Sequence, residues 1–237
     1  MISLGFWDIA LLALVSSQAT LLAYLSHPKW KAIILTLPIP FTLAALAVGL
    51  PVSTIHVVAL NLLLAFTHGV RWLHSRAGWP IILSIAVAAV GYCAAGALLR
   101  PIIPQSELSF WLACAGTLLV AAAAHKLFPR EDEPDHRSPM APWLKLPLVA
   151  AMILGLILLK RLLQGFMTLF PMVGVFAAYE ARFSLRAVCR AIPDFMFAMV
   201  PLMAVVRLAQ PRWGLGAALA AGWVVFIPLL VRLAKDL

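Results

Sequence analysis

The sequence carries very little charge for its length. Only 11% of its 237 residues are Asp, Glu, Lys or Arg, whereas 64% are hydrophobic. A water-soluble domain typically carries about 25% charged residues, because its surface must be hydrated. The shortage of charge therefore excludes a water-soluble globular domain and indicates a membrane protein.

Acidic residues are scarcer than basic ones, with 9 Asp and Glu against 18 Lys and Arg, a net charge of +9. A basic balance can indicate nucleic-acid binding, but that requires a basic stripe with interleaved aromatic residues, which this sequence lacks. Its Lys and Arg separate apolar runs, as membrane anchors and orientation signals do. We therefore expect membrane lipids and no nucleic acid as partners.

Cysteine and catalytic motifs are also sparse. The three cysteines, Cys93, Cys114 and Cys189, lie far apart and form no C-x-x-C pair, which argues against a zinc site or a redox dithiol. No H-E-x-x-H, G-x-S-x-G or G-x-x-x-x-G-K motif occurs. We predict that the protein is not an enzyme and has no metal or other cofactor.

Long apolar runs are what the sequence has instead, and several reach the roughly 20 residues that cross a bilayer. They predict an all-α, polytopic transmembrane helical bundle. The first run lacks a basic start and carries Asp8, so we interpret it as a span and not as a signal peptide. We expect about nine spans, near residues 4–25, 32–50, 54–73, 79–99, 108–127, 145–163, 165–181, 191–208 and 214–233.

The distribution of basic residues predicts the orientation, because cytoplasmic loops are enriched in Lys and Arg. Alternate loops divide the 18 basic residues thirteen against five. The richer side holds Lys29, Lys31, Arg71, Arg76, Lys126, Arg130, Arg137, Lys145, Arg182, Arg186, Arg190, Arg232 and Lys235. We predict a bacterial inner-membrane protein with its amino terminus outside and its carboxyl terminus in the cytoplasm.

Two similar proline segments interrupt the apolar runs. "TLPIP" spans Thr36, Pro38 and Pro40, and "TLFP" spans Thr168 and Pro171. Each follows a basic residue and precedes a run of small residues, a span ending in Val–Arg, and a span opened by tryptophan. This repeated order predicts an internal repeat.

The repeat would be inverted if one helix joins two four-helix units, because the odd crossing turns the second unit over. We expect a first repeat at 1–105, a connecting helix and hydrophilic cytoplasmic loop at 106–143, and a second repeat at 144–237. Proline removes a backbone donor. The carbonyls of Ile34 and Met167, four residues before Pro38 and Pro171, would lose their helical partners. Either these segments form a midplane site in an inverted-repeat transporter, or threonines merely repair two kinks.

Ionisable residues near the spans are further candidates for substrate or ion binding. His68 could shuttle protons or serve as a polar anchor at the interface. Glu180 could bind an ion or belong to an interfacial charge cluster with nearby arginines. Asp194 follows Pro193 and either binds a proton or cation, or caps the first turn of a helix. Asn61, near the middle of a span, should bond to a neighbouring helix.

The segment "GFMTLFPMVGVFAAYEARFSLRAV", residues 165–188, resembles the small four-helix GlpM-type membrane proteins. The resemblance extends from Leu148 to Leu233 and implies a fold more than an activity. Glu180 or a neighbour stands where that family has a histidine-type position. The resemblance implies a fused pair of such units, with a diverged amino-terminal copy.

The leading functional hypothesis is a transporter for an unknown small-molecule or lipid substrate, with the excess of arginine favouring an anion. One alternative is a non-transporting scaffold for envelope-polymer synthesis. A third is a lipid-modifying enzyme with an interfacial site around Glu180, Arg182 and Arg186. The sequence leaves homo-oligomerisation open.

Overall fold

The computed structural model describes residues 5–24, 34, 36–127, 147, 150, 151, 154, 163–182 and 185–235. Its elements are helical throughout these residues, as the sequence predicts. They are α1 (Phe6–Tyr24), α3 (Ile39–Val48), α4 (Thr54–Arg71), the π-helical turn η1 (Trp72–Arg76), α5 (Ile81–Leu99), α6 (Glu107–Leu127), the 3₁₀ helix η2 (Gln164–Leu169), α8 (Met172–Glu180) and α9 (Leu185–Lys235).

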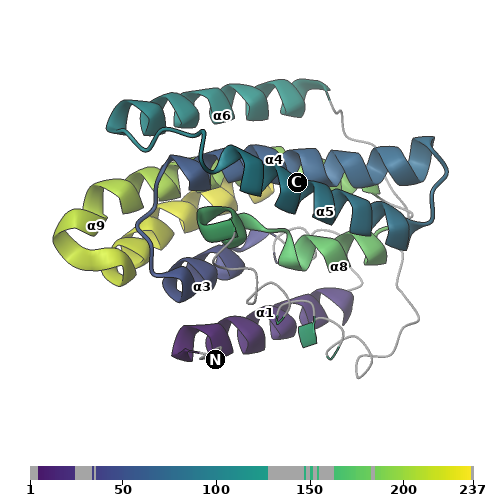
Figure 1. The fold of residues 1–237 in the computed structure, drawn as a ribbon, viewed down its shortest axis with the longest axis horizontal. Helices are drawn as coiled ribbons and strands as arrows, with labels where there is room; N and C mark the ends of the chain where they lie inside the picture. The colour runs from purple at the N-terminus through teal and green to yellow at the C-terminus, as the bar shows by residue number, and fades with distance from the viewer. Residues whose placement is uncertain are drawn as a thin grey trace.

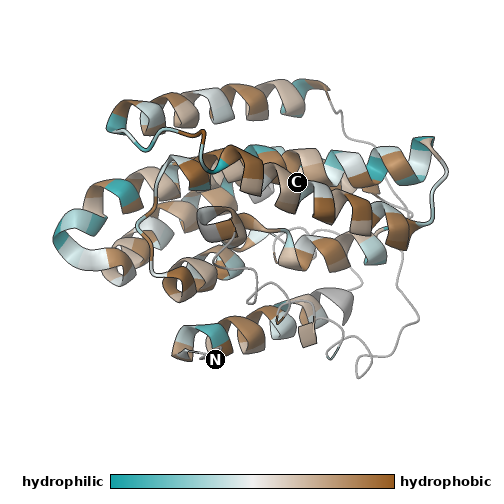
Figure 2. Cartoon of the chain, in the orientation of Figure 1, coloured by the Kyte–Doolittle hydropathy of each residue, from teal (hydrophilic) through white to brown (hydrophobic). Residues whose placement is uncertain are grey.

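Four helical stretches among these residues are long and apolar enough to cross a membrane. They are Thr54–Arg76, Ile81–Leu99, Glu107–Leu127 and Leu185–Arg232. Figure 2 shows hydrophobic helices, with hydrophilic residues gathered at the turn of α9 and near η1. This pattern is consistent with an integral membrane protein, since the apolar part of a bilayer excludes unpaired polar groups.

The long helix α9 is two arms joined at Gly214, whose φ of 74° and ψ of 167° are not helical. A positive φ favours glycine because glycine has no Cβ. The second arm folds back onto the first, so a Cβ at Gly222 would lie 2.9 Å from Val206 Cγ2 and 3.2 Å from the Leu202 carbonyl oxygen. Figure 1 shows the resulting hairpin. The arms correspond to the spans predicted at 191–208 and 214–233.

Hydrogen bonds define the relative directions of the central helices. Thr54 Oγ1 lies 3.1 Å from Ser109 Oγ, and Asn61 Nδ2 donates to Thr117 Oγ1 at 2.7 Å, so α4 and α6 run parallel. The second bond confirms the expected helix-to-helix role of Asn61. In Figure 1, α6 and α1 lie at opposite edges of the view, with α4 between them.

The first arm of α9 runs antiparallel to α4. At one end, Gln210 bonds to both backbone groups of Val52, just before α4. At the other end, Cys189 Sγ donates to the Thr67 carbonyl at 3.4 Å. The segment from Gly165 onward runs parallel to α4, because Gly165 abuts His56 and Gly174 abuts Phe66.

Several predicted span boundaries need correction. In the span expected at 32–50, the described residues Ile34 and Thr36 are helical, the helix is interrupted at Leu37 and Pro38, and the 10-residue helix α3 follows. The span expected at 165–181 is divided into η2 and α8. A 10-residue helix is about 15 Å long, which is half the thickness of the apolar bilayer. The span expected at 145–163 and the hydrophilic linker lie outside the described residues, apart from 147, 150, 151, 154 and 163.

Candidate functional site

Both proline segments interrupt a helix, as the sequence predicts. Pro38 precedes α3 with φ −80° and ψ 30°, and Pro171 precedes α8 with φ −72° and ψ 57°. Neither ψ value is helical, so each proline stands outside the helix that follows it. The short helix that follows each proline starts from that proline's carbonyl: Thr42 N donates to Pro38 O at 2.9 Å, and Val175 N donates to Pro171 O at 2.8 Å.

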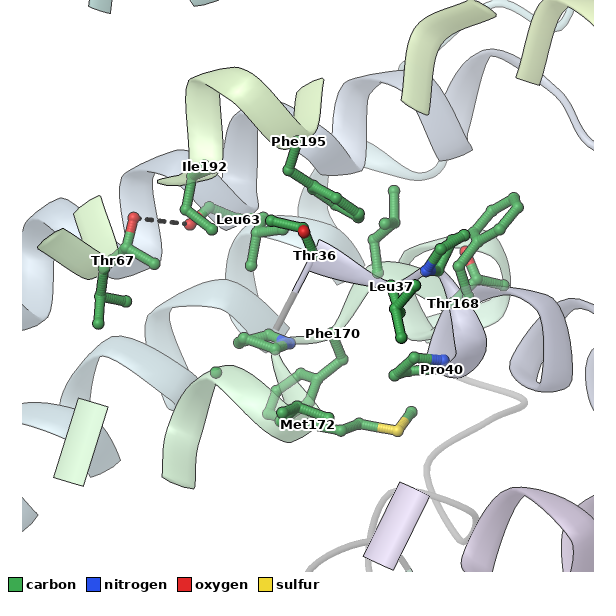
Figure 3. A pocket seen from close by; sticks show the side chains of 17 residues that line it. Thr36, Leu37, Pro40, Leu63, Thr67, Thr168, Phe170, Met172, Ile192 and Phe195 are labelled. Atoms are coloured by element: carbon green, nitrogen blue, oxygen red, sulfur yellow. Dashed lines mark hydrogen bonds between the residues drawn. The ribbon is translucent and has the colours of Figure 1, made fainter. Parts of the chain in front are cut away.

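The two interruptions face the same cavity, which has a volume of about 60 Å³. Thr36, Pro38 and Pro40 line it from one segment, and Thr168 and Pro171 line it from the other. Five of the substrate- or ion-binding candidates from the sequence therefore meet there. Figure 3 shows Thr36 near the middle of the view, with Thr67 and Thr168 on opposite sides of it.

Helices α4 and α9 complete the wall of this cavity. Leu63 and Thr67 come from α4, and Val188, Ile192 and Phe195 come from the first arm of α9. These positions are three or four residues apart, so each set lies along one face of its helix. Sequence inspection missed them because the apolar periodicity of a buried helix does not distinguish a wall of a cavity from ordinary packing.

The backbone carbonyls freed by the prolines are not all open to the cavity. Ile34 O accepts a 2.7 Å hydrogen bond from Gln18 Nε2 of α1 and a 3.3 Å bond from Leu37 N. Met167 O accepts from Phe170 N at 3.1 Å. Next to it, Phe166 O accepts from Tyr92 Oη of α5 at 2.8 Å. Local turns and buried side chains thus satisfy these carbonyls.

Gln18 and Tyr92 are positioning residues that the sequence analysis did not single out. Both are buried, at 6% and 3% exposure. A buried polar side chain in an apolar helix normally has a partner. That rule was a usable signal for Gln18, but it could not name a partner 16 residues away.

Two threonine hydroxyls in the cavity wall, those of Thr67 and Thr168, donate to their own helices. Thr67 Oγ1 donates to Leu64 O at 2.9 Å and lies 3.3 Å from Leu63 O, while Thr168 Oγ1 donates to Gly165 O at 2.7 Å. A hydroxyl has one proton and two lone pairs. Each of these threonines therefore retains acceptor capacity.

The ionisable candidates do not line this cavity. His68 follows Thr67 on α4, and its Nδ1 lies 3.0 Å from Leu64 O. Glu180 is buried at the end of α8. The carboxylate of Asp194 lies 3.0 Å from His125 Nδ1 of α6, although its neighbour Phe195 lines the cavity. None of these three residues is among those that line the cavity.

Of the two roles considered for Asp194, the helix cap is wrong, and proton or cation binding stays a prediction. The helix begins at Leu185, so Pro193 and Asp194 lie more than two turns inside α9 and not in its first turn. Asp194 is only 6% exposed and faces α6. The sequence suggested a helix start at Pro193 because proline is common at that position. Here the helix passes through the proline.

A polar cluster forms around Val52, just before the first residue of α4. Arg207 of α9 pairs with Glu107 of α6 at 2.7 Å, and its Nη1 donates to Val52 O at 3.2 Å. Gln210 accepts from Val52 N at 2.9 Å and donates to Val52 O at 3.1 Å. This cluster joins the α3–α4 turn, α6 and α9 on one side of the cavity.

Metal binding finds no support in the part of the chain that the structure describes, where no group of three or more His, Cys, Asp or Glu side chains comes together. Comparison of the chain with protein-family models, curated proteins and solved structures finds no match. The geometry of the cavity is therefore the basis for a functional proposal.

Proposed function

We propose that this protein is a membrane transporter and that the cavity between its two proline-broken segments is the closed form of its substrate site. The observation that carries the proposal is the meeting of Thr36 and Pro38 with Thr168 and Pro171 around one cavity. Interrupted helices at corresponding positions mark the substrate site in many transporters.

The inverted repeat is part of this proposal. The first repeat would contribute α3, α4 and α5, and the second would contribute α8 and the two arms of α9. Reciprocal contacts support this pairing. Tyr92 of α5 bonds to Phe166 in η2, and Trp223 of the second α9 arm donates to Thr42 of α3 at 2.8 Å. Thus α5 of the first repeat bonds to the broken segment of the second, and the second arm of α9 bonds to the broken segment of the first.

Helix directions support the same pairing. The segment from Gly165 to Glu180 runs parallel to α4. In contrast, α3 ends just before the start of α4, while the residues that precede α3 line the cavity with Leu63 and Thr67 further along α4, so α3 runs back against α4. The two broken segments are thus antiparallel, as an inverted repeat requires. The repeats at 1–105 and 144–237, nine spans, a cytoplasmic carboxyl terminus and a relation to fused GlpM-type units belong to this proposal.

Reporter fusions test the inverted topology directly. We expect a reporter fused after Lys31 to report the cytoplasm and one fused after Lys160 to report the outside. Both positions on the same face of the membrane would contradict the inverted repeat.

Alternating access of the cavity tests the transport function. In a variant without Cys93, Cys114 and Cys189, we expect Thr168→Cys to react with a membrane-impermeant maleimide added to either face of the membrane. Ala198→Cys is the matched control, because Ala198 is fully buried and does not line the cavity. A Thr168→Cys variant that reacts from one face alone, or from neither, would contradict the transport mechanism.

A scaffold for envelope-polymer synthesis is the second candidate. The small volume of the cavity and the satisfied carbonyls at Ile34 and Met167 favour it. A scaffold has no need to open a central cavity, so it predicts that Thr168→Cys stays as unreactive as Ala198→Cys. The labelling experiment therefore separates the two functions.

A further inference from the structure

We propose that the cavity binds a small, uncharged solute that donates hydrogen bonds, such as a short amide or alcohol. This inference rests on the proposed transport function and specifies the substrate class of that site. It follows from the size of the cavity, the donor and acceptor state of its threonines, and the charge of its walls.

Size limits the solute first. The cavity volume is about 60 Å³. On the same measure, one buried water needs roughly 10–15 Å³. The cavity therefore holds about four water-sized groups, or a solute of similar extent. A whole lipid or sugar molecule exceeds this volume.

The threonines define which hydrogen bonds are available. Thr67 and Thr168 both use their hydroxyl proton on a carbonyl of their own helical turn, at 2.9 and 2.7 Å. Only their lone pairs can serve a solute. The solute must therefore bring its own N–H or O–H donors to bond with them.

The charge of the wall excludes ions. Of the described residues that line the cavity, none is Asp, Glu, Lys, Arg or His, and most are apolar. An ion without a countercharge is strongly disfavoured in such surroundings. The carbonyls of Ile34, Phe166 and Met167 could replace a countercharge for a cation only if they lined the cavity, and none of these three residues is among those that line it. The arginine excess of the sequence therefore does not extend to these walls.

Acetamide is the probe that tests this inference, with three controls of nearly the same size. Acetone lacks donors, acetate is an anion, and guanidinium is a cation with donors. We expect ligand-observed NMR titrations of the purified full chain in detergent to detect acetamide binding in the millimolar range, and to detect much weaker binding of the other three. Equal binding of acetone, or preferential binding of acetate or guanidinium, would overturn the inference, as would no binding of acetamide.

Substitutions locate the binding to the threonines. Thr168→Val removes the hydroxyl while keeping the shape, and should weaken acetamide binding about tenfold, the equivalent of one hydrogen bond. Thr168→Ser keeps the hydroxyl and should restore binding. Thr20→Val is the matched control, because Thr20 bonds to Ser16 of its own helix and does not line the cavity. Acetamide binding that is equal in Thr168→Val and in the native chain would place the solute elsewhere.

The two proposals fail separately. Binding is measured at equilibrium on the native chain and does not depend on opening to either side of the membrane. Two-sided labelling of Thr168→Cys without acetamide binding would leave the transport mechanism standing and remove the solute class. Acetamide binding without two-sided labelling of Thr168→Cys would support the solute class and contradict the transport mechanism.

Discussion

The side-chain amide of Gln18 donates a 2.7 Å hydrogen bond to the carbonyl oxygen of Ile34, the residue four before Pro38. A proline at position 38 cannot donate to that carbonyl, so a helical partner is missing there. Gln18 supplies a replacement from α1. This hydrogen bond therefore links α1 to the segment that precedes Pro38.

Loss of this bond should destabilise the fold. We expect Gln18→Leu to lower the free energy of unfolding by about 1–3 kcal/mol, because Ile34 O loses its strongest buried donor. Thermal unfolding in detergent measures the change. Ser17→Ala is the matched control: Ser17 is exposed and bonds only to Ala13 of its own helix. Equal unfolding temperatures for Gln18→Leu and Ser17→Ala would show that the bond contributes nothing.

Tyr92 holds the second broken segment through its hydroxyl alone. Tyr92→Phe retains the ring and its edge contact with Phe170, whose centroid is 5.4 Å away, but leaves Phe166 O without its 2.8 Å donor. We expect Tyr92→Phe to lower the free energy of unfolding by about 1–3 kcal/mol. When it is combined with Thr168→Cys, the cysteine should react faster with maleimide. Tyr179→Phe should change neither measurement, because the Tyr179 hydroxyl bonds to none of the described residues. A Tyr92→Phe protein that behaves like Tyr179→Phe would refute this role.

Close approach of the α9 arms depends on Gly222. A Cβ at this position would lie 2.9 Å from Val206 Cγ2, 3.0 Å from Leu202 Cγ and 3.2 Å from the Leu202 carbonyl oxygen. We expect Gly222→Ala to destabilise the protein by about 1–3 kcal/mol through overpacking. Gly116→Ala on α6 meets no atom within 4 Å, so it should be neutral or gain up to about 1 kcal/mol of helix propensity. Chemical or thermal unfolding of both variants checks the contrast.

The polar cluster near Val52 should depend on Gln210 more than on Glu107. Val52 is fully buried and both of its backbone groups bond to Gln210, so Gln210→Leu should cost about 1–3 kcal/mol. The Glu107 side chain is 57% exposed, and exposed ion pairs contribute little. We expect Glu107→Gln to leave the unfolding temperature almost unchanged. A larger loss of stability in Glu107→Gln than in Gln210→Leu would show that the Glu107–Arg207 ion pair, and not Gln210, holds this cluster together.

Much of the candidate site was predictable because proline acts locally. Proline lacks a backbone N–H wherever it stands, so Pro38 and Pro171 could be recognised as helix interruptions before any packing was known. The repeated order of neighbouring features led to the hypothesis that their segments form one site, and both segments line the cavity. Thr67, Phe195 and the other wall residues were not predictable, since their roles depend on which face of α4 and α9 turns inward.

Asp194 illustrates the limit for ionisable residues. Its sequence neighbours suggested the start of a helix, but the helix begins at Leu185 and directs this carboxylate towards His125. Its neighbour Phe195 faces the cavity instead. Adjacent residues on a helix point about 100° apart, so a shift in the starting residue or in helix rotation decides which of them reaches a site.

The sequence by itself determined that the chain forms helices apolar enough to cross a membrane and that two prolines interrupt them, because hydrophobicity and the missing proline donor are properties of the residues themselves. The tertiary structure decided that both interruptions face one small cavity, that Gln18 and Tyr92 satisfy the carbonyls beside them, and that the charged candidates point elsewhere. These outcomes depend on how helices cross and rotate against one another, and contacts between distant segments set that geometry.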